Sequence, residues 1–102
     1  MTVLERLAAT IEARRTADPE VSWTARLLLG PKEKAVEKFG EEAIEAIVAA
    51  GTGRRDRLVA EAADVLYHLL VMLAAHEVSV KDVMSELERR EGLSGVAEKA
   101  SR

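Results

Sequence analysis

The chain of 102 residues contains no cysteine and only two histidines, His68 and His76. The lack of cysteine excludes a disulfide framework, a thiolate zinc site and a cysteine nucleophile. Two histidines are too few for a histidine-rich metal centre. Any metal site in this protein would therefore have to be built from carboxylates, which are the ligands that hard cations prefer.

Aromatic residues are also scarce, at 3% of the chain, whereas hydrophobic residues as a whole reach 48%. The core must therefore consist of alanine, valine, leucine and isoleucine. Apolar residues recur at helical spacing, and no segment of useful length alternates apolar and polar residues as a half-buried strand would. The sequence predicts an all-α fold, a bundle of four to five helices in a single domain (residues 1–102).

The chain has no strong excess of one charge, with a formal net charge of -3 and an isoelectric point near 5.4. This balance argues against a protein that mainly coats nucleic acid or an anionic membrane. The N-terminus lacks the order of a signal peptide, and the longest nearly uncharged run, Val65 to Ala75, is far shorter than the roughly 20 residues that span a bilayer. We expect a cytoplasmic protein with no nucleic-acid or membrane partner.

Capping residues and glycines divide the chain into five expected helices and a C-terminal tail. Ser22 and Ser79 are suitable N-caps, and Gly30, Gly51 and Gly92 are suitable stops. The expected helices are Thr2–Arg15, Ser22–Gly30, Pro31–Gly51, Arg54–Val78 and Ser79–Gly92, followed by a tail at 92–102.

The two long helices have different apolar surfaces. The third helix is amphipathic, whereas between Val59 and Val78 fifteen of twenty residues are Ala, Val, Leu, Met or Tyr and cover the whole circumference. A helix of that kind is buried on every side, which a small monomer cannot achieve. We therefore expect a homo-oligomer, a dimer in the first instance. On the third helix the apolar arc is Val36, Phe39, Ala43, Ile44, Ile47 and Val48, opposite Lys34, Lys38, Glu41, Glu42 and Glu45.

Carboxylates recur at helical spacing on both long helices. Glu61 and Asp64 are three residues apart and so share one face of an otherwise apolar helix. Glu42 and Glu45 repeat this spacing, and Glu41 adds a further carboxylate one turn before Glu45. Two helices joined by a short turn pack antiparallel, which brings these pairs to similar heights in one groove. Such a cluster cannot be fully ionised without a cation, and all-oxygen ligation suits Mg²⁺ or Mn²⁺.

A purely structural interpretation is also open for these residues. The glutamates of the third helix are compatible with a solvated face that carries salt bridges such as Lys38 with Glu42. Glu61 and Asp64 could pair with a neighbouring arginine at position 54, 55 or 57. His68 is interpreted as a satisfied core or interface histidine. However, Lys34 and Lys38 lie beside the acidic residues, where they suit a polyphosphate substrate bound with Mg²⁺.

The pattern Glu41-Glu42-x-x-Glu45 followed by Glu61-x-x-Asp64 resembles the all-α nucleoside triphosphate pyrophosphohydrolases. The segments SWTARLL, GPKEKAVEKFGEEAIEAIVAA, EAADVLYHLLVML and ERREGLSGVAEKASR are similar to the phosphoribosyl-ATP pyrophosphatases of histidine biosynthesis. The similarity extends from about Ser22 to Arg102.

This resemblance implies a nucleotide-binding hydrolase that converts phosphoribosyl-ATP to phosphoribosyl-AMP and pyrophosphate with Mg²⁺, or Mn²⁺, as cofactor. It implies metal ligation by Glu42, Glu45, Glu61 and Asp64, with Glu41 as a second-metal ligand or base and Glu45 as a further catalytic carboxylate. Phosphates would be held by Lys34, Lys38, Lys99 and Arg102.

Two other functions compete with this one. A house-cleaning pyrophosphatase that acts on ordinary or damaged nucleoside triphosphates would share the acidic motif. A helical dimerisation module with structural carboxylates would require no divalent metal.

Overall fold

The computed structural model describes residues 1–93 and 95–102, except for the side chains of residues 97 and 98. The described residues form helices and no strands, which confirms the all-α prediction. The elements are α1 (Val3–Ala13), a 3₁₀ turn η1 (Arg14–Thr16), α2 (Trp23–Leu29), α3 (Lys32–Gly51), α4 (Arg55–Ala75), α5 (Val80–Arg90) and α6 (Gly95–Ser101).

Three helices begin where a hydroxyl side chain accepts a hydrogen bond from the first turn. Thr2 accepts from the backbone N–H of Glu5 at 3.2 Å, Ser22 from that of Ala25 at 3.1 Å and Ser79 from that of Lys81 at 3.0 Å. The sequence predicted Pro31 as the first residue of the third helix. In the structure Pro31 is instead the N-cap that precedes α3. Helix α4 ends at Ala75, earlier than the expected Val78.

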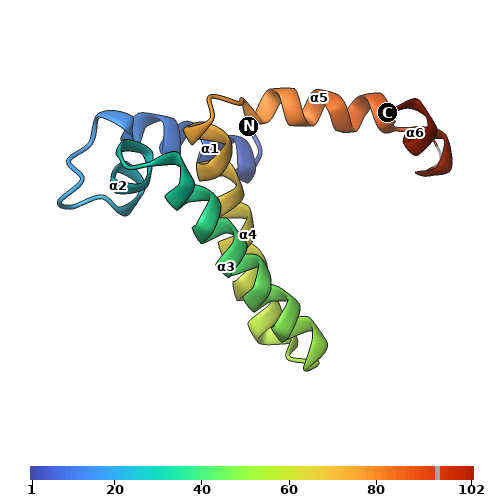
Figure 1. The fold of residues 1–102 in the computed structure, drawn as a ribbon, viewed down its shortest axis with the longest axis horizontal. Helices are drawn as coiled ribbons and strands as arrows, with labels where there is room; N and C mark the ends of the chain where they lie inside the picture. Colours follow the sequence, from blue (N-terminus) through green and yellow to red (C-terminus); the bar gives the residue numbers. More distant parts are fainter. Residues whose placement is uncertain (94) are drawn as a thin grey trace.

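Helices α3 and α4 form a long antiparallel pair, and α1 and α2 lie at its open end (Figure 1). Helix α4 is central, because it packs most extensively on α3 and also contacts α1 and α2. A hydrogen bond between the side chains of Thr24 and Tyr67 joins α2 to α4. The buried core at this end consists of Ile11, Leu27, Ala35, Leu70, Val71 and Ala75.

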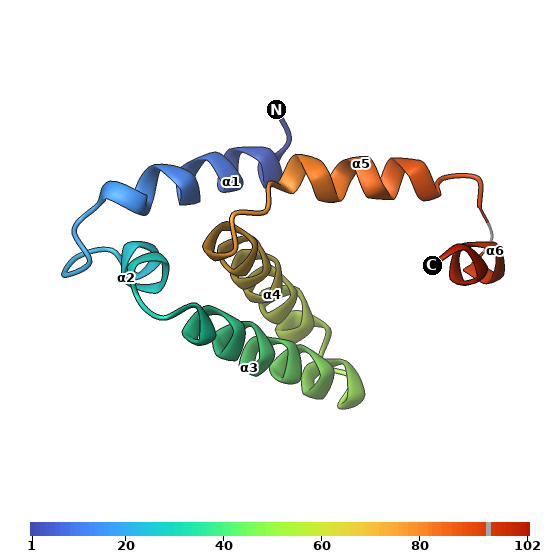
Figure 2. The same ribbon diagram turned by 45° about the horizontal axis from the view of Figure 1, so that its top comes forward.

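Helices α5 and α6 extend away from the α3–α4 pair, and α6 lies at the far end of α5 in both views (Figures 1 and 2). The Cα radius of gyration is 15.5 Å, compared with roughly 13 Å for a compact domain of this length. A single chain is therefore more extended than a self-contained globular domain. Helix α6 also lies in the segment for which the sequence predicted only a tail, of which Ser94 and two side chains are outside the described residues.

The apolar arc of α3 is largely exposed in the single chain. Ile44, Ile47 and Val48 are 61%, 68% and 57% exposed, whereas Ala35 and Ala49 are the buried residues of α3. The small alanines are therefore the buried residues of α3, and its larger apolar residues are exposed. Nor is α4 buried on every side, because Val59 and Leu66 remain exposed.

Helix α4 is long and apolar enough to cross a membrane by length and composition, the one such helix among the described residues. However, it is the central helix of the fold and contacts α1, α2 and α3. It also carries two buried polar side chains, Glu61 and His68. These features are typical of a core helix.

Candidate active site

The antiparallel pairing of α3 and α4 brings together three carboxylates from the two helices. Glu42 and Glu45 lie one turn apart on α3, and Glu61 lies on the facing stretch of α4. Each offers a carboxylate oxygen within 4.8 Å of those of the other two. The predicted convergence is therefore confirmed for these three residues.

Glu61 is the most enclosed member of this group, with 7% of its surface exposed. Its Oε1 atom accepts a hydrogen bond from Arg57 Nη2 at 3.2 Å, one of the arginine pairings considered from the sequence. Its Oε2 atom is buried and has no hydrogen-bond partner. A buried carboxylate oxygen without a partner carries a desolvation cost, which a bound cation would offset.

Lys38 borders the acidic group and pairs with two glutamates of its own helix. Its Nζ atom lies 3.0 Å from Glu41 Oε2 and 3.9 Å from Glu42 Oε1. The hydrogen bond with Glu41 raises the pKa of Lys38, and the same hydrogen bond lowers the pKa of Glu41. Both groups therefore remain charged at neutral pH. Lys34 lies one turn earlier and pairs with Glu37 at 3.8 Å.

The structure does not gather every residue that the sequence nominated. Asp64 is exposed and is not among the three carboxylates that lie within 4.8 Å of one another. Lys99 and Arg102 belong to the segment that contains α6, which lies apart from α3 and α4 in both views (Figures 1 and 2). Their assignment to the substrate remains a prediction and would require a second copy of the chain.

His68 is a buried residue with only one of its two ring nitrogens hydrogen-bonded. It is buried, as expected of a core histidine, and its Nδ1 atom lies 2.9 Å from the backbone oxygen of Asp64. However, its Nε2 atom is buried and has no hydrogen-bond partner, so the histidine is not fully satisfied. His68 follows Asp64 by four residues, so helical spacing could have placed it on the same face of α4. The unpaired Nε2 atom is visible only in the structure.

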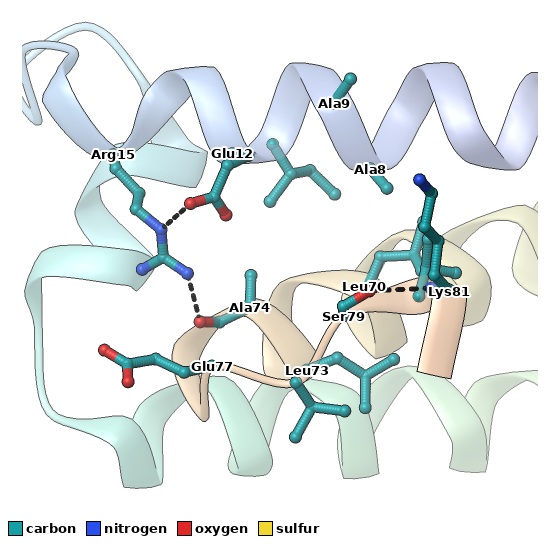
Figure 3. A pocket seen from close by; sticks show the side chains of 13 residues that line it. Ala8, Ala9, Glu12, Arg15, Leu70, Leu73, Ala74, Glu77, Ser79 and Lys81 are labelled. Carbon is teal, nitrogen blue, oxygen red and sulfur yellow. Dashed lines mark hydrogen bonds and ion pairs between the residues drawn. The ribbon is translucent and has the colours of Figure 1, made fainter. Parts of the chain in front are cut away.

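A cavity of the described residues is separate from the acidic group. About 560 Å³ lies between α1 and the connection from α4 to α5, with walls mainly of alanine, leucine, isoleucine and valine (Figure 3). Arg15 spans one side of it, donating to Glu12 at 2.6 Å and to the backbone oxygen of Ala74 at 2.5 Å. None of the catalytic, metal-binding or substrate-binding residues predicted from the sequence lines this cavity. A smaller cavity of about 220 Å³ includes Glu45 and Arg57 in its lining.

Carboxylates that converge between two antiparallel helices of an all-α chain are the arrangement expected of an α-helical pyrophosphohydrolase. The sequence profile of one such family, "Phosphoribosyl-ATP pyrophosphohydrolase", matches residues 4–91. The chain belongs to this family.

Curated relatives extend the match to the whole chain. A protein named phosphoribosyl-ATP pyrophosphatase from Cereibacter sphaeroides is 69% identical over 100% of this chain and 99% of its own length. A protein of the same name from Dinoroseobacter shibae is 65% identical over 100% of both chains. A third, from Paracoccus denitrificans, is 64% identical over 99% of this chain and 94% of its own. The chain is therefore a hydrolase of a histidine-biosynthetic family.

Proposed function

We propose that this protein hydrolyses phosphoribosyl-ATP to phosphoribosyl-AMP and pyrophosphate, the second step of histidine biosynthesis. The full-length similarity to relatives that bear this name supports the substrate. The single structural observation that carries the proposal is the group Glu42, Glu45 and Glu61 between α3 and α4. Carboxylates and phosphate groups are both negatively charged, so a substrate with several phosphates binds at this group through a cation.

The residues fit a hard divalent cation. Three carboxylates form an all-oxygen donor set, and the unpaired Oε2 atom of Glu61 is a donor that the protein itself leaves without a partner. Glu42, Glu45 and Glu61 would hold Mg²⁺ or Mn²⁺, with Asp64 as the fourth ligand predicted from the sequence. When bound, the cation supplies positive charge that neutralises phosphate oxygens and polarises the bond to the leaving pyrophosphate.

The protein side chains have two further tasks, which are to hold the phosphates and to accept a proton. Lys38 stays protonated beside Glu41, so it and Lys34 present positive charge along the same edge of α3. Water forms a bond to phosphorus as the bond to pyrophosphate breaks, and its proton must pass to a base. Glu41 is ionised and is not one of the carboxylates proposed to hold the cation, so it is the proton acceptor in this proposal.

We also propose that the active form is a homo-oligomer, most simply a dimer. Ile44, Ile47 and Val48 lie on one arc of α3 and are more than half exposed, and Val59 on α4 is 73% exposed. Exposed apolar clusters on soluble chains commonly mark interfaces. The extended shape of the single chain is a second, independent argument for a partner.

Phosphoribosyl-ATP is expected to be hydrolysed at least about tenfold more efficiently than ATP or dUTP, because the basic residues exceed what a metal-bound triphosphate needs and an extra ribose phosphate would use the surplus. The measurement is kcat/KM for the three substrates in the presence of Mg²⁺. Lys38→Ala should weaken phosphoribosyl-ATP turnover more than ATP turnover. Glu33→Ala, on the first turn of α3, is the matched control.

Two outcomes would contradict this account of selectivity. Equal losses for phosphoribosyl-ATP and ATP in Lys38→Ala would assign this lysine to the shared triphosphate. Hydrolysis of ATP and dUTP by the intact enzyme as efficiently as phosphoribosyl-ATP would favour the house-cleaning function.

A further inference from the structure

His68 is a buried polar residue that is not among the proposed metal ligands. It follows Glu61 by seven residues, two helical turns, so both residues lie on the same side of α4 at roughly 10 Å along the helix axis. Both are 7% exposed, and α3 is the helix that covers α4 most extensively. His68 therefore lies further along the α3–α4 contact, away from the turn between these helices.

The hydrogen bond to Asp64 fixes the role of each ring nitrogen. The Nδ1 atom lies 2.9 Å from the backbone oxygen of Asp64, which can only accept, so Nδ1 carries the hydrogen. In the neutral ring the other nitrogen, Nε2, is then an acceptor. The neighbouring ring of Tyr67 packs edge-on at 4.8 Å between centroids and limits rotation of the imidazole.

The structure therefore holds a hydrogen-bond acceptor at a fixed position without giving it a donor, since Nε2 is buried and unpaired. Such an atom is destabilising for the protein alone. We propose that His68 is a substrate-positioning residue, whose Nε2 atom accepts a hydrogen bond from an N–H or O–H group on the nucleoside part of the bound nucleotide. This inference rests on the proposed function, because it names the contact beyond the phosphates of the same substrate.

The acceptor character of Nε2 favours the nucleoside over the phosphates. Phosphate oxygens are acceptors and cannot donate to Nε2. A water beside the phosphorus is the competing donor, because Asp64, the proposed fourth ligand, lies one turn from His68, and the split between KM and kcat described below distinguishes the two. The N–H and O–H groups of the base and sugars lie further along the substrate and carry the donors that an acceptor can recognise.

Two variants separate the nitrogens of His68. His68→Gln can place its amide oxygen near the Nε2 position, whereas His68→Asn keeps only a short polar group near Nδ1. Loss of one substrate hydrogen bond should raise KM and the dissociation constant of phosphoribosyl-AMP about tenfold in His68→Asn, with a smaller change in kcat. His68→Gln should recover most of this binding. His68→Leu should bind as weakly as His68→Asn and yet melt at a temperature no lower than the parent.

The intact protein provides a test that does not depend on folding of the variants. It has only two histidines, and the exposed His76 is an internal control. In ¹⁵N-labelled protein, AMP and phosphoribosyl-AMP should shift the His68 Nε2 resonance upfield, as expected of an acceptor that gains a hydrogen bond. Pyrophosphate with Mg²⁺ should leave it in place.

The outcomes are distinct. Unchanged phosphoribosyl-AMP binding in all three variants would overturn the inference, and so would a fall in kcat alone, which would assign His68 to the attacking water. A shift with pyrophosphate but not with AMP would also overturn it. If AMP shifts the resonance while the parent fails to hydrolyse phosphoribosyl-ATP, the nucleoside contact stands and the proposed reaction is wrong.

Discussion

Glu45→Gln is expected to reduce kcat/KM for phosphoribosyl-ATP by at least about 100-fold while the helical content is retained. The substitution keeps the shape of the side chain but removes the charge of a proposed metal ligand. Without a divalent metal, the variant should melt at or above the melting temperature of the parent, because Glu45 lies within 4.8 Å of two other carboxylates and its neutralisation relieves repulsion.

The control for this prediction is Glu37→Gln, which removes one charge from the exposed surface of the same helix, where Glu37 pairs with Lys34. It should change kcat/KM less than about twofold, as expected for an exposed ion pair. More than a tenth of parental activity in Glu45→Gln would contradict the assignment. Asp64→Asn completes the series: a loss comparable to that of Glu45→Gln would support the fourth ligand, and retained activity would restrict the site to the three carboxylates.

Leu70→Glu should unfold the chain, whereas Ile47→Glu should leave it helical but disrupt association. Leu70 is 6% exposed within the core that joins α1 to α4, and burying a charge there costs about 4 kcal/mol or more, most of the stability of a small domain. Ile47 is 68% exposed on α3, so a glutamate at this position remains solvated in the single chain.

Circular dichroism and light scattering distinguish these two effects. The parent should scatter as twice 11.1 kDa, and Ile47→Glu as 11.1 kDa with its helical spectrum retained. Leu70→Glu should lose the spectrum itself. A parent that is a folded 11.1 kDa species at micromolar concentration would contradict the proposed oligomer, and a folded Leu70→Glu would contradict the core position of this residue.

The sequence predicted those parts of the fold that local chemistry determines. Ser22 and Ser79 marked helix starts because a hydroxyl at an N-cap satisfies a free backbone N–H. Gly51 and the residues after it marked the turn between the two long helices. Because that turn is short, the antiparallel pairing followed, and with it the convergence of Glu42 and Glu61.

Features that depend on packing between distant segments were not predictable in the same way. Helical spacing defined the apolar arc of α3, but it did not indicate that small alanines such as Ala49 would be buried while Ile47 stayed exposed. The helix at Gly95–Ser101 is short and begins at a glycine, so periodicity gave no signal. The unpaired Nε2 atom of His68 depends on what covers α4, which the sequence does not specify.

The central claim is that the carboxylates of α3 and α4 form a divalent-metal site for hydrolysis of phosphoribosyl-ATP. Its most direct test is the release of pyrophosphate from phosphoribosyl-ATP by protein first freed of metal with a chelator and then titrated with Mg²⁺. We predict no release above background without metal, saturable recovery as Mg²⁺ is added, and no recovery in Glu45→Gln. Turnover that is unchanged in the presence of excess chelator, or recovery by Mg²⁺ that is equal in Glu45→Gln and the parent, would contradict the claim.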